Sequence, residues 1–153
     1  MKKIIWSVLL AAGLLASCST DENEETTTDY SKSPVSGKIY ERIFNVGGGA
    51  ARSVTLNGTK SFYIYLTPDS IDCDGTFGSP IWITVPAKVG EYTNNSSLQF
   101  RDNVSESFEG AIDKKIEILS ISKTKIKGRL KATGFYSFEN NINGTFEVQY
   151  CPL

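Results

Sequence analysis

The side chains that could carry acid–base chemistry are carboxylates, because the sequence of 153 residues contains no histidine. This composition excludes histidine-dependent triads, histidine acid–base steps and Cys/His zinc sites. A carboxylate-only glycosidase needs two carboxyls about 5–10 Å apart across a cleft. Asp69, Asp72, Asp74 and Glu91 could supply them, but no recognisable catalytic motif contains them. We therefore expect the chain not to be an enzyme.

The loop from Asp69 to Gly75 is the most polar loop of the predicted domain. Its Asp-x-Asp-Gly run from Asp72 matches a fragment of a calcium-binding loop, but no glutamate stands at the twelfth position from Asp69 or Asp72. A turn capped by Asp side chains explains the same residues. No Gly-rich phosphate loop occurs between a strand and a helix either. The sequence therefore predicts neither a metal site nor a cofactor.

Three aromatic residues are candidates for ligand binding. Tyr63, Tyr65 and Trp82 occupy the positions opposite the core-facing residues of their predicted strands. If those strands are neighbours, the rings form an outward patch that can stack on sugar rings, since exposed apolar patches often mark binding sites. In a barrel, or with a second sheet above them, the same rings belong to the core, and tyrosine and tryptophan are also ordinary strand residues.

A row of basic residues occupies alternate positions near one predicted strand. The cations line one face, while the residues between them, from Ile126 to Ala132, face the other way. Such a ridge predicts binding of an anionic glycan, a lipid phosphate or an acidic partner. A solvated face, or lysines that guard an edge strand, is the alternative. The five cations are Lys123, Lys125, Lys127, Arg129 and Lys131.

The first 17 residues have the pattern of a signal peptide. Lys2 and Lys3 precede an apolar run that is much shorter than the roughly 20 residues of a membrane-spanning helix. The segment Leu15-Ala16-Ser17-Cys18 resembles the lipobox of bacterial lipoproteins. This resemblance implies cleavage before Cys18, and acyl chains on Cys18 that anchor the protein to a membrane. An ordinary secretory signal is the alternative.

An acidic segment follows the cysteine. The four acidic residues between positions 21 and 25 resemble the surface-export signal of Bacteroidota lipoproteins. Ser19, directly after the cysteine, fits outer-membrane sorting as known in other Gram-negative bacteria. The segment's composition cannot bury apolar area, so residues 18–33 are expected to form a disordered tether. Residues 34–153 have the length of one domain.

The predicted domain is nearly neutral. From Ser33 onward it carries 13 basic and 12 acidic residues, which does not support nucleic-acid binding. In an exported protein, Cys73 and Cys151 are expected to form a disulfide because the compartment is oxidising. Two free thiols are the alternative.

Short β-type runs separated by turn signals fill the domain, and no stretch has a helical period. Asn57-Gly58, Asn143-Gly144 and the triplet Gly47–Gly49 are among the expected turns. The pattern predicts an antiparallel β-sandwich of roughly 8–9 strands, with a flattened up-and-down β-barrel as the alternative. The expected strands are 35–46, 52–57, 61–67, 80–85, 97–101, 114–122, 125–133, 134–138 and 145–151.

The two-residue period also predicts the buried face of each strand. The alternation breaks between Ile118 and Leu119, which indicates a β-bulge. The expected core consists of Phe62, Ile64, Leu66, Ile81, Ile83, Val85, Leu98, Phe100, Phe146, Val148 and Tyr150.

The second half of the chain resembles small Bacteroidota lipoproteins whose domains have no known function. The resemblance rests on a Gly-x-Tyr element at Gly90–Tyr92 and a closing Gly-x-Phe-x-Val strand at 144–148. It implies an anchored β domain and transfers no catalytic residues. In addition, Asp69-Ser70-Ile71 resembles the Asp-Ser/Thr-apolar site at which Bacteroidota O-glycosylate exported proteins, which makes Ser70 a candidate acceptor.

These observations predict a surface-exposed, outer-membrane lipoprotein whose β domain binds a glycan or a protein without catalysis. A structural envelope component with no small ligand is the alternative from a different class. A carboxylate-dependent glycan hydrolase is the third possibility considered.

Overall fold

The computed structural model describes residues 30–73, 78–135 and 139–152. The predicted signal peptide, Cys18, the tether up to residue 29, and Asp74 lie outside these residues. All regular elements of the described part are strands, which confirms the all-β prediction. No helix in that part is long and apolar enough to cross a membrane. The strands are β1 (Ser36–Ile39), β2 (Arg42–Asn45), β3 (Gly48–Leu56), β4 (Thr59–Thr67), β5 (Ile81–Pro86), β6 (Gly90–Tyr92), β7 (Ser97–Arg101), β8 (Phe108–Ile121), β9 (Lys125–Gly134) and β10 (Asn141–Cys151).

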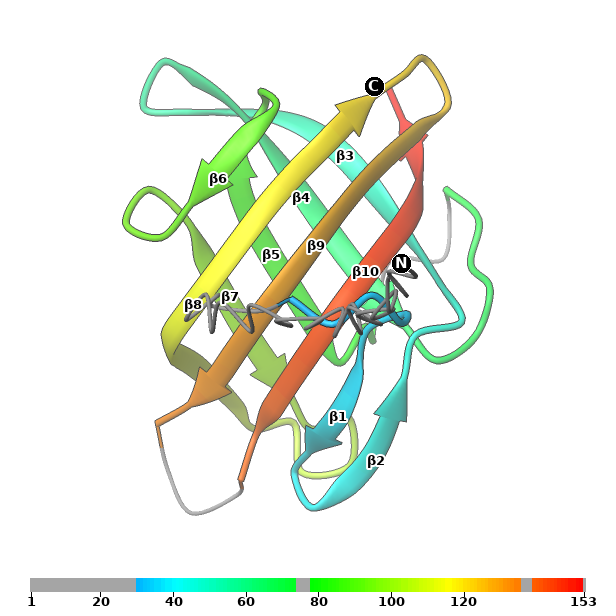
Figure 1. The fold of residues 1–153 in the computed structure, drawn as a ribbon, viewed down its shortest axis with the longest axis vertical. Helices are drawn as coiled ribbons and strands as arrows, with labels where there is room; N and C mark the ends of the chain where they lie inside the picture. The colour runs from blue at the N-terminus through cyan, green and yellow to red at the C-terminus, as the bar shows by residue number, and fades with distance from the viewer. Residues whose placement is uncertain (1–29, 74–77, 136–138, 153) are drawn as a thin grey trace, which may run out of the picture.

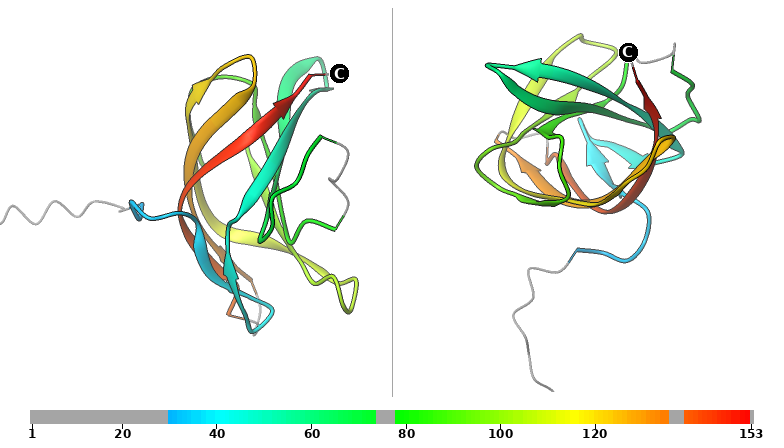
Figure 2. Two further views of the ribbon diagram at one scale, coloured as in Figure 1. Left: turned by 90° about the vertical axis from the view of Figure 1, so that its right-hand side faces the viewer. Right: turned by 90° about the horizontal axis from the view of Figure 1, so that it is seen from above.

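Seven of these strands close into a ring (Figures 1 and 2). Hydrogen-bonded neighbours follow the order β10-β3-β4-β5-β7-β8-β9, and β9 pairs with β10 to complete the circuit. The pairs are antiparallel except at one junction, where Ala50–Arg52 of β3 runs parallel to Gln149–Cys151 of β10. The expectation of a wholly antiparallel sheet is wrong at this junction. Strands so far apart in the chain are not joined by a hairpin, which would force them antiparallel.

The core fills the inside of the ring. Every residue of the expected core is buried except Tyr150, which is half-buried and packs edge-on against Phe62 with ring centres 5.6 Å apart. The alternation of buried and solvent-facing residues is unbroken in β5 and β9. The two-residue period therefore placed the inner face correctly, because successive side chains of a strand point to opposite faces.

A hairpin of β1 and β2 adds to one end of the ring and buries Ile39 and Phe44 there. The expected single strand over 35–46 is wrong, since Tyr40 and Glu41 form a turn in the middle of it. Both have positive φ angles, 46° and 66°, as a two-residue hairpin turn requires. Neither is a residue type that favours this conformation.

A β-bulge and a hairpin turn occur where the sequence predicted them. The pairing of β8 with β9 shifts between Ile118 and Ser120, which confirms the bulge, and a second, unpredicted shift follows Ala111. Asn57 and Gly58 have φ angles of 48° and 77° and join β3 to β4, which confirms this turn. The short strand β6 was not predicted, and residues 136–138 of an expected strand lie outside the described part.

Two glycine-containing segments that were expected to form turns lie inside strands. Asn143 and Gly144 belong to β10. A Cβ atom on Gly144 would lie 2.6 Å from the carbonyl oxygen of Ser33, because the chain preceding β1 crosses β10 there. Gly48 and Gly49 belong to β3, and a Cβ atom on Gly48 would lie 2.8 Å from the Cα of Ser70. Glycine here allows close approach of another backbone segment.

Candidate functional site

The three candidate aromatic residues lie together on the outer face of the ring. β4 and β5 are hydrogen-bonded neighbours, with Tyr65 opposite Trp82 and Tyr63 opposite Thr84. Their inward neighbours, including Ile64, are buried, so the aromatic side chains point outward and are half-buried. The condition for one outward patch, that these strands are neighbours, is met. The expectation that a barrel would turn these rings into the core is wrong, because the sheet closes into a ring and they lie on its outer face.

Tyr65 and Trp82 contact each other edge to face. Their ring centres are 5.4 Å apart and their planes are inclined by 86°, which is a favourable arrangement for two aromatic rings. The Nε1 atom of Trp82 is covered and has no hydrogen-bond partner among the described residues. Trp82 therefore offers a ligand its ring and not its N–H group.

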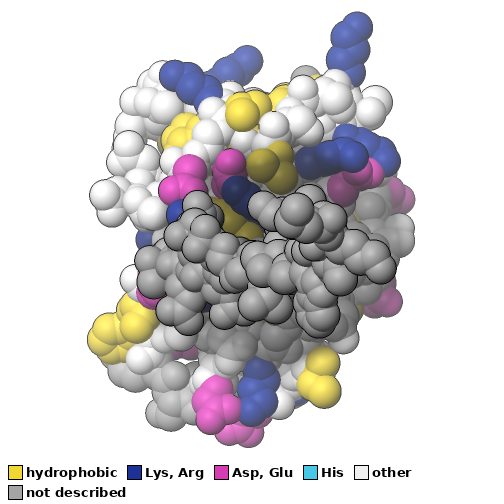
Figure 3. Space-filling view, viewed as in Figure 1, with side chains coloured by type: hydrophobic (Ala, Val, Ile, Leu, Met, Phe, Trp, Pro, Cys, Tyr) yellow, Lys and Arg dark blue, Asp and Glu magenta, His cyan; other side chains and the backbone are white. Residues whose placement is uncertain are grey.

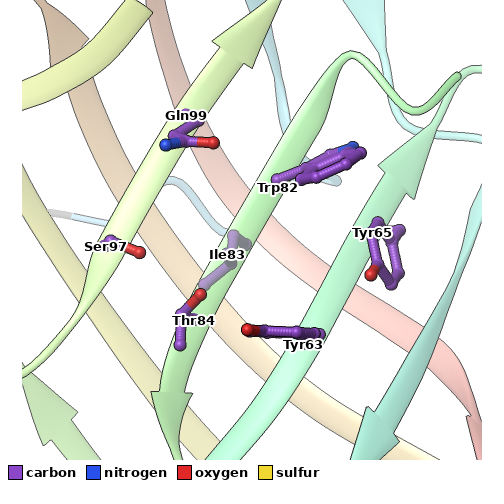
Figure 4. Close-up of a pocket in the computed structure, with 7 residues that line it drawn as sticks. All are labelled: Tyr63, Tyr65, Trp82, Ile83, Thr84, Ser97 and Gln99. Atoms are coloured by element: carbon purple, nitrogen blue, oxygen red, sulfur yellow. The ribbon is translucent and has the colours of Figure 1, made fainter. Parts of the chain in front are cut away.

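A depression of about 260 Å³ lies beside these rings (Figure 4). In the figure the polar ends of Tyr63, Ser97 and Gln99 point into the area between the three strands. Within the described part of the chain, no hydrogen bond to another protein group occupies the side chains of these three residues or of Tyr65 and Thr84. Donors and acceptors are thus available at the depression. Its lining comprises Tyr63, Tyr65, Trp82, Ile83, Thr84, Ser97 and Gln99.

The electrostatic surroundings keep the Tyr65 hydroxyl in its neutral form. Burial raises the pKa of Tyr65, and Tyr63 adds to the effect, whereas the nearby Arg52 opposes it. Because burial disfavours the phenolate, the hydroxyl remains protonated at neutral pH and can donate a hydrogen bond.

The basic row predicted from the sequence lies on the outer face of β9, with Lys123 in the turn before the strand. The hypothesis that these residues guard an edge strand is wrong, because β9 pairs with β8 on one side and with β10 on the other. The alternation itself is confirmed: Lys125, Lys127 and Lys131 are exposed, and Arg129 is half-buried.

Much of this positive charge is paired. Lys125 and Lys127 both contact Glu147, the latter at 2.8 Å, and Arg129 contacts Glu117 at 2.5 Å. Hydrogen bonds from Lys125 and Lys127 lower the pKa of Glu147 to about 2, so the carboxylate stays charged in ordinary buffers. Figure 3 shows basic and acidic side chains intermingled on this wall.

Tyr30, the first described residue, also covers part of the basic row. The ring of Tyr30 lies over the Arg129 guanidinium at 4.4 Å and near the Lys115 ammonium at 5.4 Å. Its hydroxyl donates to Glu91 at 3.4 Å. Residues 30–33, expected to belong to a disordered tether, therefore contact the ring. Burial and the nearby carboxylates raise the pKa of the Tyr30 hydroxyl.

The two candidate surfaces lie on opposite walls of the ring, the basic row on β9 and the aromatic depression on β4, β5 and β7 (Figure 1). No protein-family model, curated protein or solved structure matches the chain. The function is therefore inferred from geometry. The aromatic depression has unoccupied polar groups beside half-buried aromatic rings. The middle of the basic row, by contrast, is covered by Tyr30 or ion-paired.

The predicted disulfide is present. Cys73 and Cys151 are bonded, with Cα atoms 5.6 Å apart, and the bond ties the loop after β4 to the end of β10. The Arg52 guanidinium donates a hydrogen bond to the Cys73 carbonyl. In the same loop, Ser70 is exposed, as an O-glycosylation acceptor would have to be.

Of the carboxylates considered for hydrolysis, those that the structure describes lie on separate elements. Glu91 lies on β6 and contacts Lys115 at 3.0 Å, whereas Asp69 and Asp72 lie in the loop that the disulfide holds. Among the described residues, no group of three or more His, Cys, Asp or Glu side chains is placed to hold a metal ion.

Sequence reasoning missed Thr84, Ser97 and Gln99. The two-residue alternation that placed Trp82 on the outside also indicates that these side chains point outward. That they lie beside the aromatic residues follows only from the pairing of β5 with β7, which places Gln99 opposite Trp82 and Ser97 opposite Thr84. Pairing between strands that are separated by β6 cannot be read from local pattern alone.

Proposed function

We propose that this protein is a lipoprotein anchored through Cys18 to the outer membrane and facing the cell exterior, and that its β domain binds carbohydrate without catalysis. The observation that carries the proposal is the depression on β4, β5 and β7. It combines three half-buried aromatic residues with hydroxyl and amide groups that no described protein group occupies.

Carbohydrate matches this combination better than a purely apolar ligand. The C–H face of a sugar ring packs on an aromatic ring, whose face is electron-rich. The sugar hydroxyls need donors and acceptors, which Tyr63, Thr84, Ser97 and Gln99 provide around the rings. The volume of about 260 Å³ lies near the lower end of the range for small-molecule pockets, which suits one sugar ring at a time.

The position of the tether is compatible with this role. Tyr30, the first described residue, lies against β9, on the wall opposite the depression. Figure 2 (left) shows the described N-terminal segment, in blue, on the side of β8–β10. A membrane anchor on that side leaves the aromatic wall directed to the surroundings.

The test of carbohydrate binding is a glycan array with the full chain at low and high salt. We expect binding that resists salt, because stacking is not ionic, and a loss of roughly tenfold or more on Trp82→Ala, the usual size for a central aromatic residue. Phe135→Ala removes an exposed ring elsewhere and serves as the control. Salt-sensitive binding that survives Trp82→Ala but is lost on Lys125→Ala would contradict the proposal and favour the basic row.

The anchor has its own test. Replacing Cys18 with serine removes the sulfur to which the lipid attaches, so we expect the protein to move from the membrane fraction to the soluble fraction. Cell fractionation with detection of the chain measures this, and the Cys73→Ser/Cys151→Ser double variant should remain with the membrane. Retention of the Cys18→Ser variant on membranes would refute the lipid anchor.

A further inference from the structure

A second depression adjoins the first on the far side of Trp82. It has a volume of about 380 Å³ and is lined by Trp82, Gln99, Arg101, Glu106 and Phe108. Trp82 and Gln99 line both depressions, so the two form one continuous surface from β4 to β8. Three strand spacings separate β4 from β8, or roughly 14 Å. This span is longer than a single sugar ring.

Arg101 in this second depression is a half-buried cation. Its guanidinium carbon lies 5.7 Å from the centre of the Trp82 ring. Among the described residues no carboxylate lies within ion-pair distance of it, whereas Arg42 contacts Asp102 at 3.1 Å and Arg129 contacts Glu117. A partly buried charge is costly without a partner. An unpaired guanidinium on an aromatic ring is therefore prepared to bind an anionic group.

Aromatic residues stand on the two strands beside that of Arg101, Trp82 on β5 and Phe108 on β8. Phe108 pairs with Arg101 in register on β8 and is 72% exposed, so its ring stands free on the side opposite Trp82. A guanidinium carries its N–H groups in the planar fork that fits a carboxylate. Glu106 is the acidic residue at this depression, and its exposed carboxylate opposes an anionic ligand.

We propose that the site takes an oligosaccharide of at least two rings that carries a carboxylate, as in a hexuronic acid, with Arg101 as the residue that selects the acidic sugar. This inference rests on the proposed carbohydrate binding. The first depression holds one ring, Trp82 lies between the two positions, and the acidic ring lies between Trp82 and Phe108 over Arg101.

The experiment compares two matched ligands by calorimetry with the full chain in detergent: tetragalacturonic acid and its carboxyl-reduced, neutral counterpart. We expect the acid to bind about tenfold more tightly, as for a charge-assisted bidentate contact. Arg101→Gln should weaken binding of the acid about tenfold more than binding of the neutral ligand, which removes the difference between them. Arg101→Lys should restore part of the preference, because it keeps the charge and loses the fork. Glu106→Gln should strengthen binding of the acid by a few-fold, since it removes a repulsive charge.

The outcomes separate the two proposals. Equal binding of both tetramers, lowered for both by Trp82→Ala, would overturn the preference for acidic sugars and leave carbohydrate binding intact. Galacturonic acid monomer that binds as tightly as the tetramer would overturn the two-ring site. Failure of both tetramers to bind, together with a negative glycan array, would overturn both proposals. Melting curves of each variant show whether it is folded.

Discussion

Removing the Cys73–Cys151 disulfide is expected to lower the free energy of unfolding by about 2–4 kcal/mol. The bond closes a segment with a sequence separation of 78 residues that contains β5 to β9 and most of β10. Without it, the unfolded chain gains conformational freedom, which for a loop of this length is worth about 4 kcal/mol at most in the chain-entropy model. Chemical denaturation of the Cys73→Ser/Cys151→Ser variant measures the difference.

The same variant should affect the aromatic site less than the fold. The disulfide holds the Cys73 carbonyl that accepts a hydrogen bond from Arg52, and Arg52 pairs in register with Tyr63. The loop is thus linked to the rim of the depression and not to its lining. Cys18→Ser, which leaves the disulfide in place, is the control for loss of a cysteine. A double variant with the stability of the unmodified chain would show that the bond adds nothing to the fold.

The sequence predicted those features of the fold that depend on local pattern. Alternation along Ile81, Ile83 and Val85 identified the buried face, because side chains of a strand alternate regardless of what the strand pairs with. The break at Ile118–Leu119 identified a bulge for the same reason: an extra residue reverses the alternation. Asn57-Gly58 identified a hairpin because these residues tolerate positive φ.

The errors arose where contacts distant in sequence determine the conformation. Tyr40 and Glu41 adopt positive φ although neither side chain favours it, and the packing of Ile39 and Phe44 in the end of the ring holds the turn in place. Asn143-Gly144 is a pair typical of hairpin turns, but here glycine is required because the chain at Ser33 crosses β10 next to Gly144. The parallel pairing of β3 with β10 leaves no local trace, because it joins Ala50–Arg52 to Gln149–Cys151, which lie far apart in the sequence.

The candidate site was predicted in part. Tyr63, Tyr65 and Trp82 were placed on one outward patch, on the condition that their strands pair, and the pairing of β4 with β5 meets that condition. The basic row was placed on the correct face of β9, but its ion pairs with Glu147 and Glu117 depend on which strands lie beside β9. Such cross-strand partners are a property of the sheet order, which the sequence pattern does not determine.

Substituting one phenylalanine inside the ring and one outside it should distinguish effects on stability from effects on ligand binding. Phe146 of β10 points inward, is 4% exposed, and lies so close over Gly128 that a Cβ atom there would be 2.4 Å from its ring. Phe146→Ala is expected to lower the free energy of unfolding by about 3–5 kcal/mol, because it removes a buried ring and leaves a cavity. Phe108→Ala removes an exposed ring and should change stability by less than about 0.5 kcal/mol.

For ligand affinity we expect the opposite order of effects to that for stability. Phe108 lines the second depression, so Phe108→Ala should weaken binding of the acidic tetramer, whereas Phe146→Ala, on the wall away from the depressions, should leave the affinity of the folded protein unchanged. Denaturant unfolding and calorimetry below the melting transition measure the two quantities on the same preparations. If Phe108→Ala leaves the affinity unchanged, the ligand does not extend beyond Trp82. If Phe146→Ala costs less than about 1 kcal/mol, the interior of the ring is packed more loosely than the burial of Phe146 implies.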